Sequence, residues 1–247
     1  MPTLAPEIIF YIGNFPVTNT VLNTILVDLI IVVSVLYISK KITKLVPDMF
    51  QNIIELLVQS FYDLTETVAG KNASKIFPFF MSFFLFIIIA NWSGLILGSD
   101  LIGLKEHGGA KDHLIPFFRN ASSDMNFTIA LALVSAFATH ILSLKTIGIK
   151  KYLSHYFSFN PINLFVGILD IISEATKIIS LSFRLFGNIF AGEMVLVIIG
   201  GLLSFFVIPV PFISFEIFVG LIQAIVFSML TMVFMTMLMT PRHQEHN

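Results

Sequence analysis

The stretch NLFVGILDIISEATKIISLSFRLFGNIFAGEMVLVIIG, from Asn163 to Gly200, is a long apolar segment with charged residues along it. As an α-helix it would measure roughly 55 Å, at about 1.5 Å per residue. The hydrocarbon core of a bilayer is only about 30 Å thick, and about 20 apolar residues are enough to cross it. One upright crossing cannot contain this segment. We therefore expect a membrane helix that tilts steeply, bends, or lies partly in the membrane plane.

The composition of the whole chain indicates the same class of protein. Hydrophobic residues make up 56% of the 247 positions and charged residues only 12%, against about 25% charged residues in an ordinary soluble domain. A disordered chain would have few hydrophobic and many charged residues. A soluble domain of this composition would have too little polar surface to face water. The net charge of −1 provides no basic surface for nucleic acid. We expect an all-α, polytopic membrane protein in contact with the lipid bilayer.

Four other runs are long and apolar enough to cross a bilayer as helices. They are Val21–Ser39, Ile76–Gly98, Phe127–Leu144 and Phe212–Met239. Together with the long segment they predict about five membrane helices, of which the last two form a long tilted hairpin.

A different pattern lies between the first two spans. In Asp48–Val68 the apolar residues recur every three to four positions, which predicts an amphipathic helix. It would lie on the membrane surface or along the bundle, and a helix packed on a soluble partner fits about equally well. We expect one membrane domain over residues 1–247. Its parts are 1–44 with the first span, 45–70 with the surface helix, 76–146 with two spans and 161–241 with the hairpin.

Lysine placement predicts the orientation of the chain in the membrane. Lysines gather between the first two spans and after the third, at positions 40, 41, 44, 71 and 75 and at 145, 150 and 151, while residues 201–211 carry no charge. By the positive-inside rule the N-terminus is outside and the C-terminus is cytoplasmic. Residues 1–20 contain no Lys or Arg, which a secretory signal or a mitochondrial transit peptide requires. We expect a bacterial plasma membrane, although an organelle-encoded chain would look the same.

Ionisable residues inside the apolar spans are the candidate functional residues. They are Asp170, Glu174, Lys177, Arg184 and Glu193 in the long segment and Glu216 in the last span. Each such group costs at least a few kcal/mol at membrane depth, so it usually faces a bundle interior or a water-filled cavity and marks an ion or proton pathway.

Helical counting relates the outer residues of this set. Asn188 follows Arg184 at i+4 and shares its face, whereas Glu193 is nine residues on and points to the opposite face. If the last two spans form a hairpin, Glu193 lies near Glu216 and Gln223 lies near Arg184. Two carboxyl groups in one wet cavity can share protons, which makes Glu193 and Glu216 candidates for a proton relay.

Arg184 suits a gate between two aqueous pockets. A guanidinium stays charged at any physiological pH, so it can attract a carboxylate but cannot pass a proton on. Asp170, Glu174 and Lys177 would belong to the cytoplasmic pocket. Structural alternatives stay open, because Arg184 can pair with a carboxylate to hold the bundle and Lys177 can pair with an acidic neighbour. Glu193 and Glu216 can also be buried packing residues, and the roles of Asp28, Asp124 and His140 are undetermined.

Motifs for bond chemistry are missing from the chain. There is no His-Glu-x-x-His zinc site, no phosphate-binding Gly-x-x-x-x-Gly-Lys loop and no Gly-x-Ser-x-Gly elbow. The chain has no Cys, which excludes Cys-ligated metals and thiolate nucleophiles. We expect no cofactor, no metal and no bond chemistry on this chain, and an intramembrane hydrolase finds no convincing nucleophile–base pair.

Ser182–Glu193, SFRLFGNIFAGE, resembles the signature of subunit a of F-type ATP synthases, in which an Arg-Leu-x-x-Asn core precedes Ala-Gly and then Glu or His. The stretch LIQAIVF, Leu221–Phe227, is similar to the family's Gln-Ala region. The stretches SEATKIISLSFR, IIIANWSGLI and SSDMNFTIALAL also fit, so the resemblance covers nearly the whole chain.

The resemblance implies a stator beside a rotating ring of c subunits, with peripheral stalk b subunits and the F1 sector as further partners. Protons would load a ring carboxylate through an outer half-channel and leave through an inner one. By resemblance, the residue roles are Arg184 as the gate, Glu193 and Glu216 as the outer relay, Asn188 and Gln223 as polar neighbours of Arg184, and Asp170, with Glu174 and Lys177 nearby, as the inner half-channel. The alternative is a stand-alone proton-coupled secondary transporter or channel, with Arg184 binding an anion. The choice between H⁺ and Na⁺ stays open.

Overall fold

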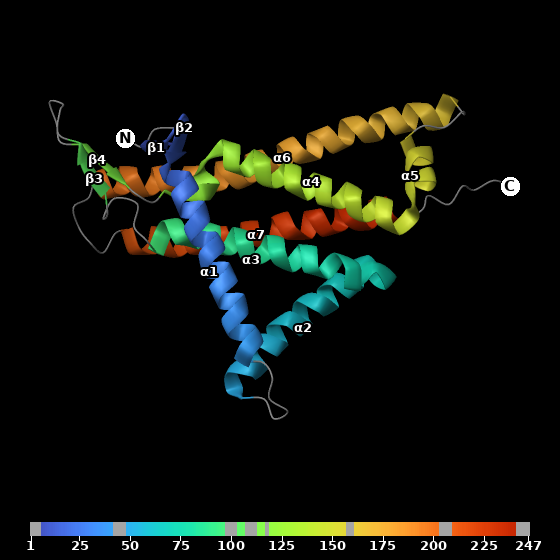
Figure 1. Ribbon diagram of the computed structural model, residues 1–247, viewed down its shortest axis with the longest axis horizontal. Coiled ribbons are helices and arrows are strands. Elements are labelled where there is room, and N and C mark those ends of the chain that lie inside the picture. Colours follow the sequence, from blue (N-terminus) through green and yellow to red (C-terminus); the bar gives the residue numbers. More distant parts are fainter. Residues whose placement is uncertain are drawn as a thin grey trace.

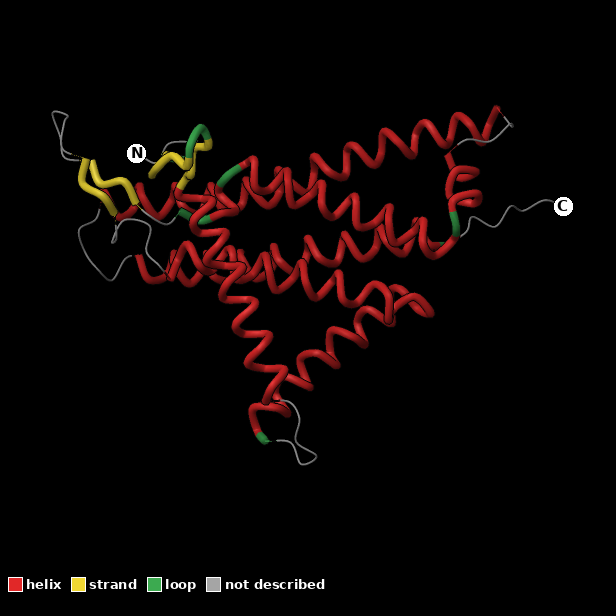
Figure 2. The backbone as a smooth tube through the Cα atoms, viewed as in Figure 1, coloured by secondary structure: helices red, strands yellow, loops and turns green. Residues whose placement is uncertain are grey.

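The computed structural model describes residues 6–41, 48–96, 103–106, 113–116, 119–156, 161–202 and 209–240. Within these residues the chain is almost entirely helical (Figures 1 and 2). The α-helices are α1 (Asn19–Lys41), α2 (Met49–Ala69), α3 (Ala73–Ile96), α4 (Met125–Ile147), α5 (Ile149–Tyr156), α6 (Pro161–Leu202) and α7 (Pro209–Met239). Two single turns of 3-10 helix, η1 (Gly70–Asn72) and η2 (Ala121–Ser123), precede α3 and α4.

Five helical segments of the described chain are long and apolar enough to cross a membrane. They correspond to the five predicted spans, although α2 and α3 form one continuous candidate from Met49 to Leu95. The prediction of an all-α polytopic membrane protein is therefore confirmed. The last two segments are the hairpin of α6 and α7, which lie side by side (Figure 1).

The length of α6 agrees with the expectation from the sequence. It has 42 residues and measures about 63 Å at 1.5 Å per residue, about twice the thickness of a bilayer core. Pro161 is its first residue and Pro209 is the first residue of α7, which is where proline costs a helix nothing because that N–H has no partner within the helix.

The bundle consists of α3, α4, α6 and α7, and its core is built from their large apolar side chains. Phe83, Ile87, Leu131, Leu185 and Phe227 are buried in one cluster at the centre. Lipid tails are as apolar as these side chains, so close packing and interhelical hydrogen bonds, rather than exclusion of water, hold membrane helices together. Two such bonds join α4 to α7. The hydroxyls of Ser135 and Thr231 are 2.8 Å apart, and Ser143 donates to the carbonyl of Leu238 at 2.8 Å.

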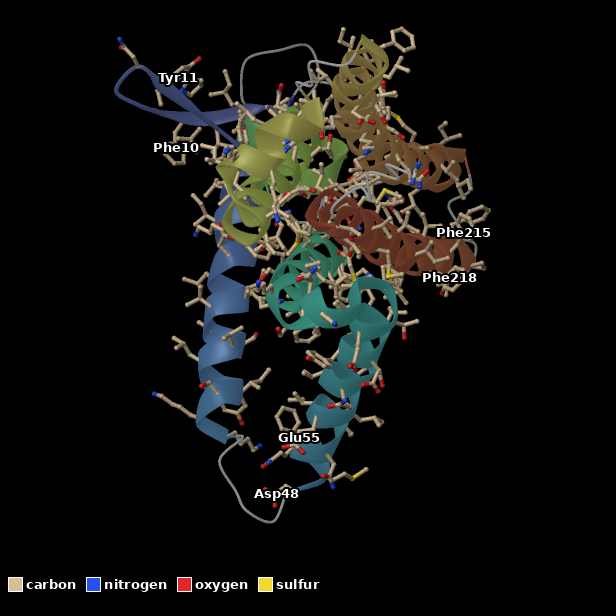
Figure 3. The ribbon with its side chains drawn as sticks, turned by 90° about the vertical axis from the view of Figure 1, so that its right-hand side faces the viewer. Phe10, Tyr11, Asp48, Glu55, Phe215 and Phe218 are labelled. Atoms are coloured by element: carbon tan, nitrogen blue, oxygen red, sulfur yellow. The ribbon has the colours of Figure 1, made fainter. Side chains whose placement is uncertain are left out.

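Helix α2 packs on the bundle with only its C-terminal half. There the ring of Phe61 lies 4.8 Å from that of Phe84, centroid to centroid. The N-terminal half of α2 diverges from α3 and carries Asp48 and Glu55 far from the bundle (Figure 3). Its apolar side chains are exposed, as Met49 at 81% shows. The predicted amphipathic helix therefore exists, and half of it runs along the bundle.

Two short β-hairpins and α5 were not predicted from the sequence. Strands β1 (Ile8–Ile12) and β2 (Phe15–Thr18) pair antiparallel, as do β3 (Gly103–Glu106) and β4 (His113–Pro116). Both hairpins lie at the end of the bundle where α1 and α7 begin, here called the hairpin end (Figure 1). Helix α5 lies at the opposite end, here called the α5 end, together with the start of α3 and the end of α4.

Candidate functional site

Arg184 lies in the middle of α6 and is exposed on the surface of this chain. It is about 35 Å from the first residue of α6 and about 27 Å from the last, at 1.5 Å per residue. Its Nη2 is 3.4 Å from Oγ of Ser180, one turn earlier on the same helix. Among the described residues no carboxylate lies at ion-pair distance from it. The guanidinium is therefore presented outward from the bundle.

A stripe of small and polar residues runs along α6 on both sides of Arg184. Ser180, Arg184, Asn188, Ala191 and Val195 recur every three or four residues, and all five are exposed. The Cβ position of Gly187, also on this side, meets no atom within 4 Å. Small residues on a membrane helix let a second helix approach closely. We call these five residues the α6 stripe.

Asn188 links the α6 stripe to α7. Its Nδ2 donates a hydrogen bond to Oε1 of Gln223 at 3.0 Å. Gln223 is 2% exposed, so the bond lies at the inner edge of the stripe. The structure thus brings Asn188 and Gln223 together one turn from Arg184.

Glu216 on α7 is a buried acid without a partner. It is 4% exposed, and neither carboxyl oxygen has a hydrogen-bond partner in the described part of the chain. It packs against Gly192 of α6, where an added Cβ would lie 3.2 Å from the carboxyl carbon. An unpaired ionised carboxylate is costly in such a place. The position therefore suits a group that exchanges its proton with water or with a passing carboxyl group.

An open cavity of about 750 Å³ lies between α6 and the first half of α7. Asn188 and Glu216 are its polar lining residues, and the remaining lining is apolar or glycine. We call it the α6–α7 cavity. Beside it, Phe215 and Phe218 point away from the bundle (Figure 3) and are 64% and 57% exposed.

Glu193 is half-buried and follows Gly192 directly. Because Gly192 touches Glu216, the depth of Glu193 in the hairpin matches that of Glu216, as helical counting predicts. Glu193 is not among the described residues that line the α6–α7 cavity. The structure therefore assigns the cavity to Glu216 and Asn188.

Side chains of α3 hold the segment of α7 that carries Glu216. Nδ2 of Asn91 donates to the carbonyl of Gly220 at 3.0 Å, and Nε1 of Trp92 donates to the carbonyl of Ile217 at 3.2 Å. An added Cβ on Gly220 would lie 3.2 Å from Cβ of Asn91, a tight contact that glycine avoids.

A second polar cluster lies at the α5 end. Oε2 of Glu174 is 3.5 Å from Nε2 of His140 on α4, and Oε1 of Glu174 accepts a hydrogen bond from the hydroxyl of Tyr156 on α5. Nδ1 of His140 is 2.8 Å from the hydroxyl of Tyr152. We call these four residues the α5 cluster.

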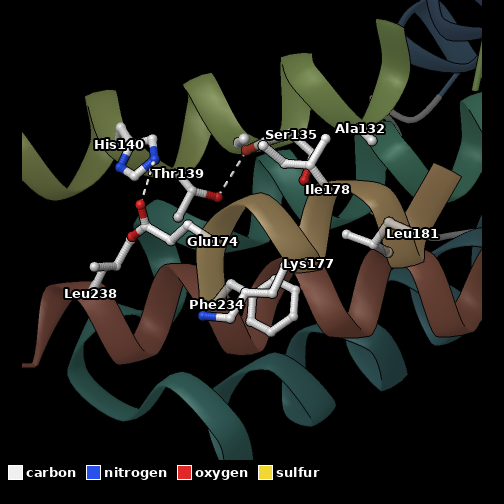
Figure 4. Close-up of a pocket in the computed structure, with 11 residues that line it drawn as sticks. Ala132, Ser135, Thr139, His140, Glu174, Lys177, Ile178, Leu181, Phe234 and Leu238 are labelled. Atoms are coloured by element: carbon white, nitrogen blue, oxygen red, sulfur yellow. Dashed lines mark hydrogen bonds and ion pairs between the residues drawn. The ribbon is translucent and has the colours of Figure 1, made fainter. Parts of the chain in front are cut away.

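Lys177 does not join an acid in the described structure, although the sequence left that possibility open. Its Nζ lies over the ring of Phe234, 4.6 Å from the centroid (Figure 4), an arrangement that stabilises a cation by the ring's negative face. Lys177, Glu174 and His140 line a small cavity of about 30 Å³. Asp170 is half-buried one turn before Glu174.

Sequence reasoning missed Tyr152 and Tyr156 of the α5 cluster and left the role of His140 open. The spacing of Tyr152 and Tyr156 at i and i+4, next to two lysines, was the available signal for an amphipathic turn of helix. Asp124 has a structural role, since its carboxylate accepts the backbone N–H of Asn126 at 2.9 Å and caps α4. Asp28 is exposed on α1.

Comparison with known proteins matches the chain to a family model and to relatives of similar length. The family model of the ATP synthase A chain matches residues 21–236. The ATP synthase subunit a of Moorella thermoacetica is 29% identical over 234 residues, which cover 95% of this chain and 96% of that protein.

Proposed function

We propose that this chain, which belongs to the ATP synthase A chain family, carries protons along two offset half-channels that Arg184 separates. As an ATP synthase subunit a it is the stator of the F0 proton channel. Family membership sets aside the alternative of a stand-alone transporter. Within that channel, Arg184 and the polar residues of α6 and α7 around it would carry and separate the protons.

The exposure of Arg184 on an apolar surface is the observation that carries the proposal. A permanent charge at membrane depth is too costly to face lipid, and this one has no acid partner among the described residues. A partner surface with its own carboxylate would remove the cost. The shallow α6 stripe fits a packed helix on either side of Arg184. We assign that surface to the ring of c subunits, whose carboxyl group would pass Arg184 in each step.

The charge on Arg184 would separate the two pathways. A ring carboxylate that has lost its proton is attracted to the guanidinium, whereas a proton is repelled by it and cannot travel through a group that stays protonated. A proton can then cross only by riding on the ring.

On the outer side, Glu216 and Glu193 would load the ring carboxyl group. Glu216 and Asn188 line the α6–α7 cavity, and this cavity adjoins the α6 stripe. Asn188 and Gln223 would keep α6 and α7 in register at the point where the proton is handed over. Glu193, on the other side of α6, would be the earlier member of the relay.

On the inner side, Glu174, Lys177 and Asp170 would lead the proton away. All three lie between Arg184 and the α5 end. The lysines of α5 and of the start of α3 lie at that end, and the strands lie at the other. This distribution supports a cytoplasmic α5 end and an N-terminus outside, in a bacterial plasma membrane. Peripheral stalk b subunits would hold the stator against torque and connect it with the F1 sector.

The assembled complex in inverted vesicles tests the gate. Arg184→Ala should abolish ATP-driven proton pumping while c subunits still copurify with the chain. Phe183→Ala, the neighbouring exposed residue, should pump normally. Wild-type pumping by Arg184→Ala would refute the role of Arg184.

A further inference from the structure

The α5 cluster joins three helices through one carboxylate. Glu174 of α6 divides its two oxygens between His140 of α4 and Tyr156 of α5. His140 in turn contacts Tyr152 of α5 through its other ring nitrogen. The side chains of His140 and Glu174 are 28% and 21% exposed, so this chain encloses neither of them completely. Figure 4 shows the carboxylate of Glu174 directed at the imidazole ring.

Both charge states of His140 are compatible with these contacts. When the imidazole is neutral, one ring nitrogen donates and the other accepts; when it is protonated, both donate. The hydroxyl of Tyr152 can donate to Nδ1 or accept from it by rotating its hydrogen. His140 can therefore gain and lose a proton while it keeps both neighbours.

A proton can pass from Glu174 to His140 and on to water in steps that account for every proton donated and accepted. Oε2 of Glu174 gives a proton to Nε2 of His140, which leaves a carboxylate and an imidazolium. The imidazolium then releases a proton from Nδ1 to water by way of the Tyr152 hydroxyl, which accepts one proton as it gives up another. The imidazole is neutral again and returns to its first tautomer through water. Burial raises the pKa of Tyr152, so its hydroxyl exchanges protons without remaining ionised.

Helix α5 is fixed in place by its backbone as well as by its tyrosines. The carbonyl of Tyr156 lies where a Cβ on Gly167 of α6 would be, so α5 can approach α6 only at a glycine. The rings of Tyr152 and Tyr156 are 5.3 Å apart, centroid to centroid. Tyr156 is 7% exposed, whereas Lys150 and Lys151 are exposed on the same helix.

A small cavity lies beside the α5 cluster and shares Glu174 and Lys177 with the proposed inner half-channel. Its volume of about 30 Å³ is enough to hold a water molecule. His140 and Thr139 of α4 and Glu174 and Lys177 of α6 line it, while α7 contributes Phe234 and Leu238. The titratable groups that face His140 are thus Glu174 and Lys177 from α6 and Tyr152 and Tyr156 from α5. Lys177 is one turn closer to Arg184.

We propose that His140 and Glu174 form the proton-exit pair of this chain and that α5 positions the pair through Tyr152 and Tyr156. The inference rests on the proposed function, because it places these residues at the mouth of the inner half-channel. His140 and Glu174 carry the proton, the Tyr152 hydroxyl passes it between His140 and water, and Tyr156 is a positioning residue.

ATP-driven pumping by the assembled complex in inverted vesicles tests the pair, because the α5 side then faces the bath and protons enter through the pair, in the reverse of the exit step. His140→Ala should lower the pumping rate about a hundredfold, the smaller end of what a positioned proton-transfer group contributes. Added imidazole should restore part of the rate, since the site is open to water; a purely structural role would not be rescued. Ile141→Ala, its exposed neighbour on α4, should pump normally. Tyr156→Phe should shift the dependence of the rate on bath pH.

Two outcomes would overturn the inference. One is a wild-type rate and pH profile in His140→Ala, and the other is a loss of pumping that imidazole does not rescue in a fully assembled complex. Arg184→Ala is measured in parallel. If it abolishes pumping while His140→Ala pumps normally, the exit pair is wrong and the gate stands. If both variants pump normally, the proposed function fails as well.

Discussion

Asn188 on α6 and Gln223 on α7 are joined by a side-chain hydrogen bond of 3.0 Å. The bond lies one helical turn from Arg184, at the edge of the stripe that we assign to the ring of c subunits. Asn188 is exposed and Gln223 is buried, so the contact connects the surface of the chain with its interior. The contact between the two long helices beside Arg184 is therefore made by a pair of amides rather than by opposite charges.

Gln223→Leu removes this bond with little change in volume. A hydrogen bond of this kind contributes about 0.5–1.5 kcal/mol, which corresponds to a several-fold change in the fraction of correctly registered gates. We expect assembly to be preserved and ATP-driven pumping to fall several-fold. The double variant Asn188→Leu with Gln223→Leu should be no worse than the single one, because the amides act as a pair. Additive losses in the pumping rates would contradict this coupling.

Gly192→Ala should displace Glu216 from its place in the α6–α7 cavity. The new Cβ would lie 3.2 Å from the carboxyl carbon and from Oε1 of Glu216, closer than ordinary van der Waals contact. We expect slower proton loading from the outer side and a lower rate of proton-driven ATP synthesis at low proton concentration on that side, with little loss of assembly. Leu196→Ala, which also lines the cavity and lies outside the α6 stripe, provides a matched small change without the clash. Equal rates in the two variants at every outer pH would remove Glu216 from the relay.

The sequence predicted the parts of this molecule whose signal lies within one segment. The excess length of α6 follows from its apolar run, and the placing of Asn188 beside Arg184 follows from a spacing of four residues. The α5 cluster depends on His140 and Glu174, which are 34 positions apart, and the bond from Asn91 to Gly220 spans 129 positions. Such contacts depend on how helices pack against one another, and the hydrophobic periodicity of a single segment gives no information about that packing. The β1–β2 hairpin had a local signal, Gly13 between two short apolar runs, which the larger signal of the spans obscured.

Tyr156→Phe should weaken the dependence of the chain's folding stability on pH in the alkaline range. Burial, followed by the hydrogen bond to Glu174, raises the pKa of Tyr156. A tyrosine whose pKa is higher in the folded state stabilises the fold fully below its pKa in the unfolded chain, about 10. This stabilisation is lost as the pH rises further. Thermal melting in detergent should show the wild type more stable at pH 7–9 and the two proteins converging above pH 10. A constant difference up to pH 11 would show that the Tyr156 hydroxyl is not held in its neutral form.

Gly187→Ala separates the fold of the chain from its contact with the ring. The added methyl group meets no atom within 4 Å in this chain, and alanine favours a helix over glycine by about 1 kcal/mol. The variant chain alone should therefore melt at the same temperature as the wild type or slightly higher.

Beside a ring helix packed on the α6 stripe, the same methyl group would hold the two surfaces apart and move the ring carboxylate away from Arg184. We expect weaker copurification of c subunits and reduced pumping, while Ala175→Ser, an exposed position of α6 closer to the α5 end, should leave both unchanged. Normal pumping by Gly187→Ala would mean that the ring does not approach α6 at this face, and the assignment of the stripe would have to be abandoned.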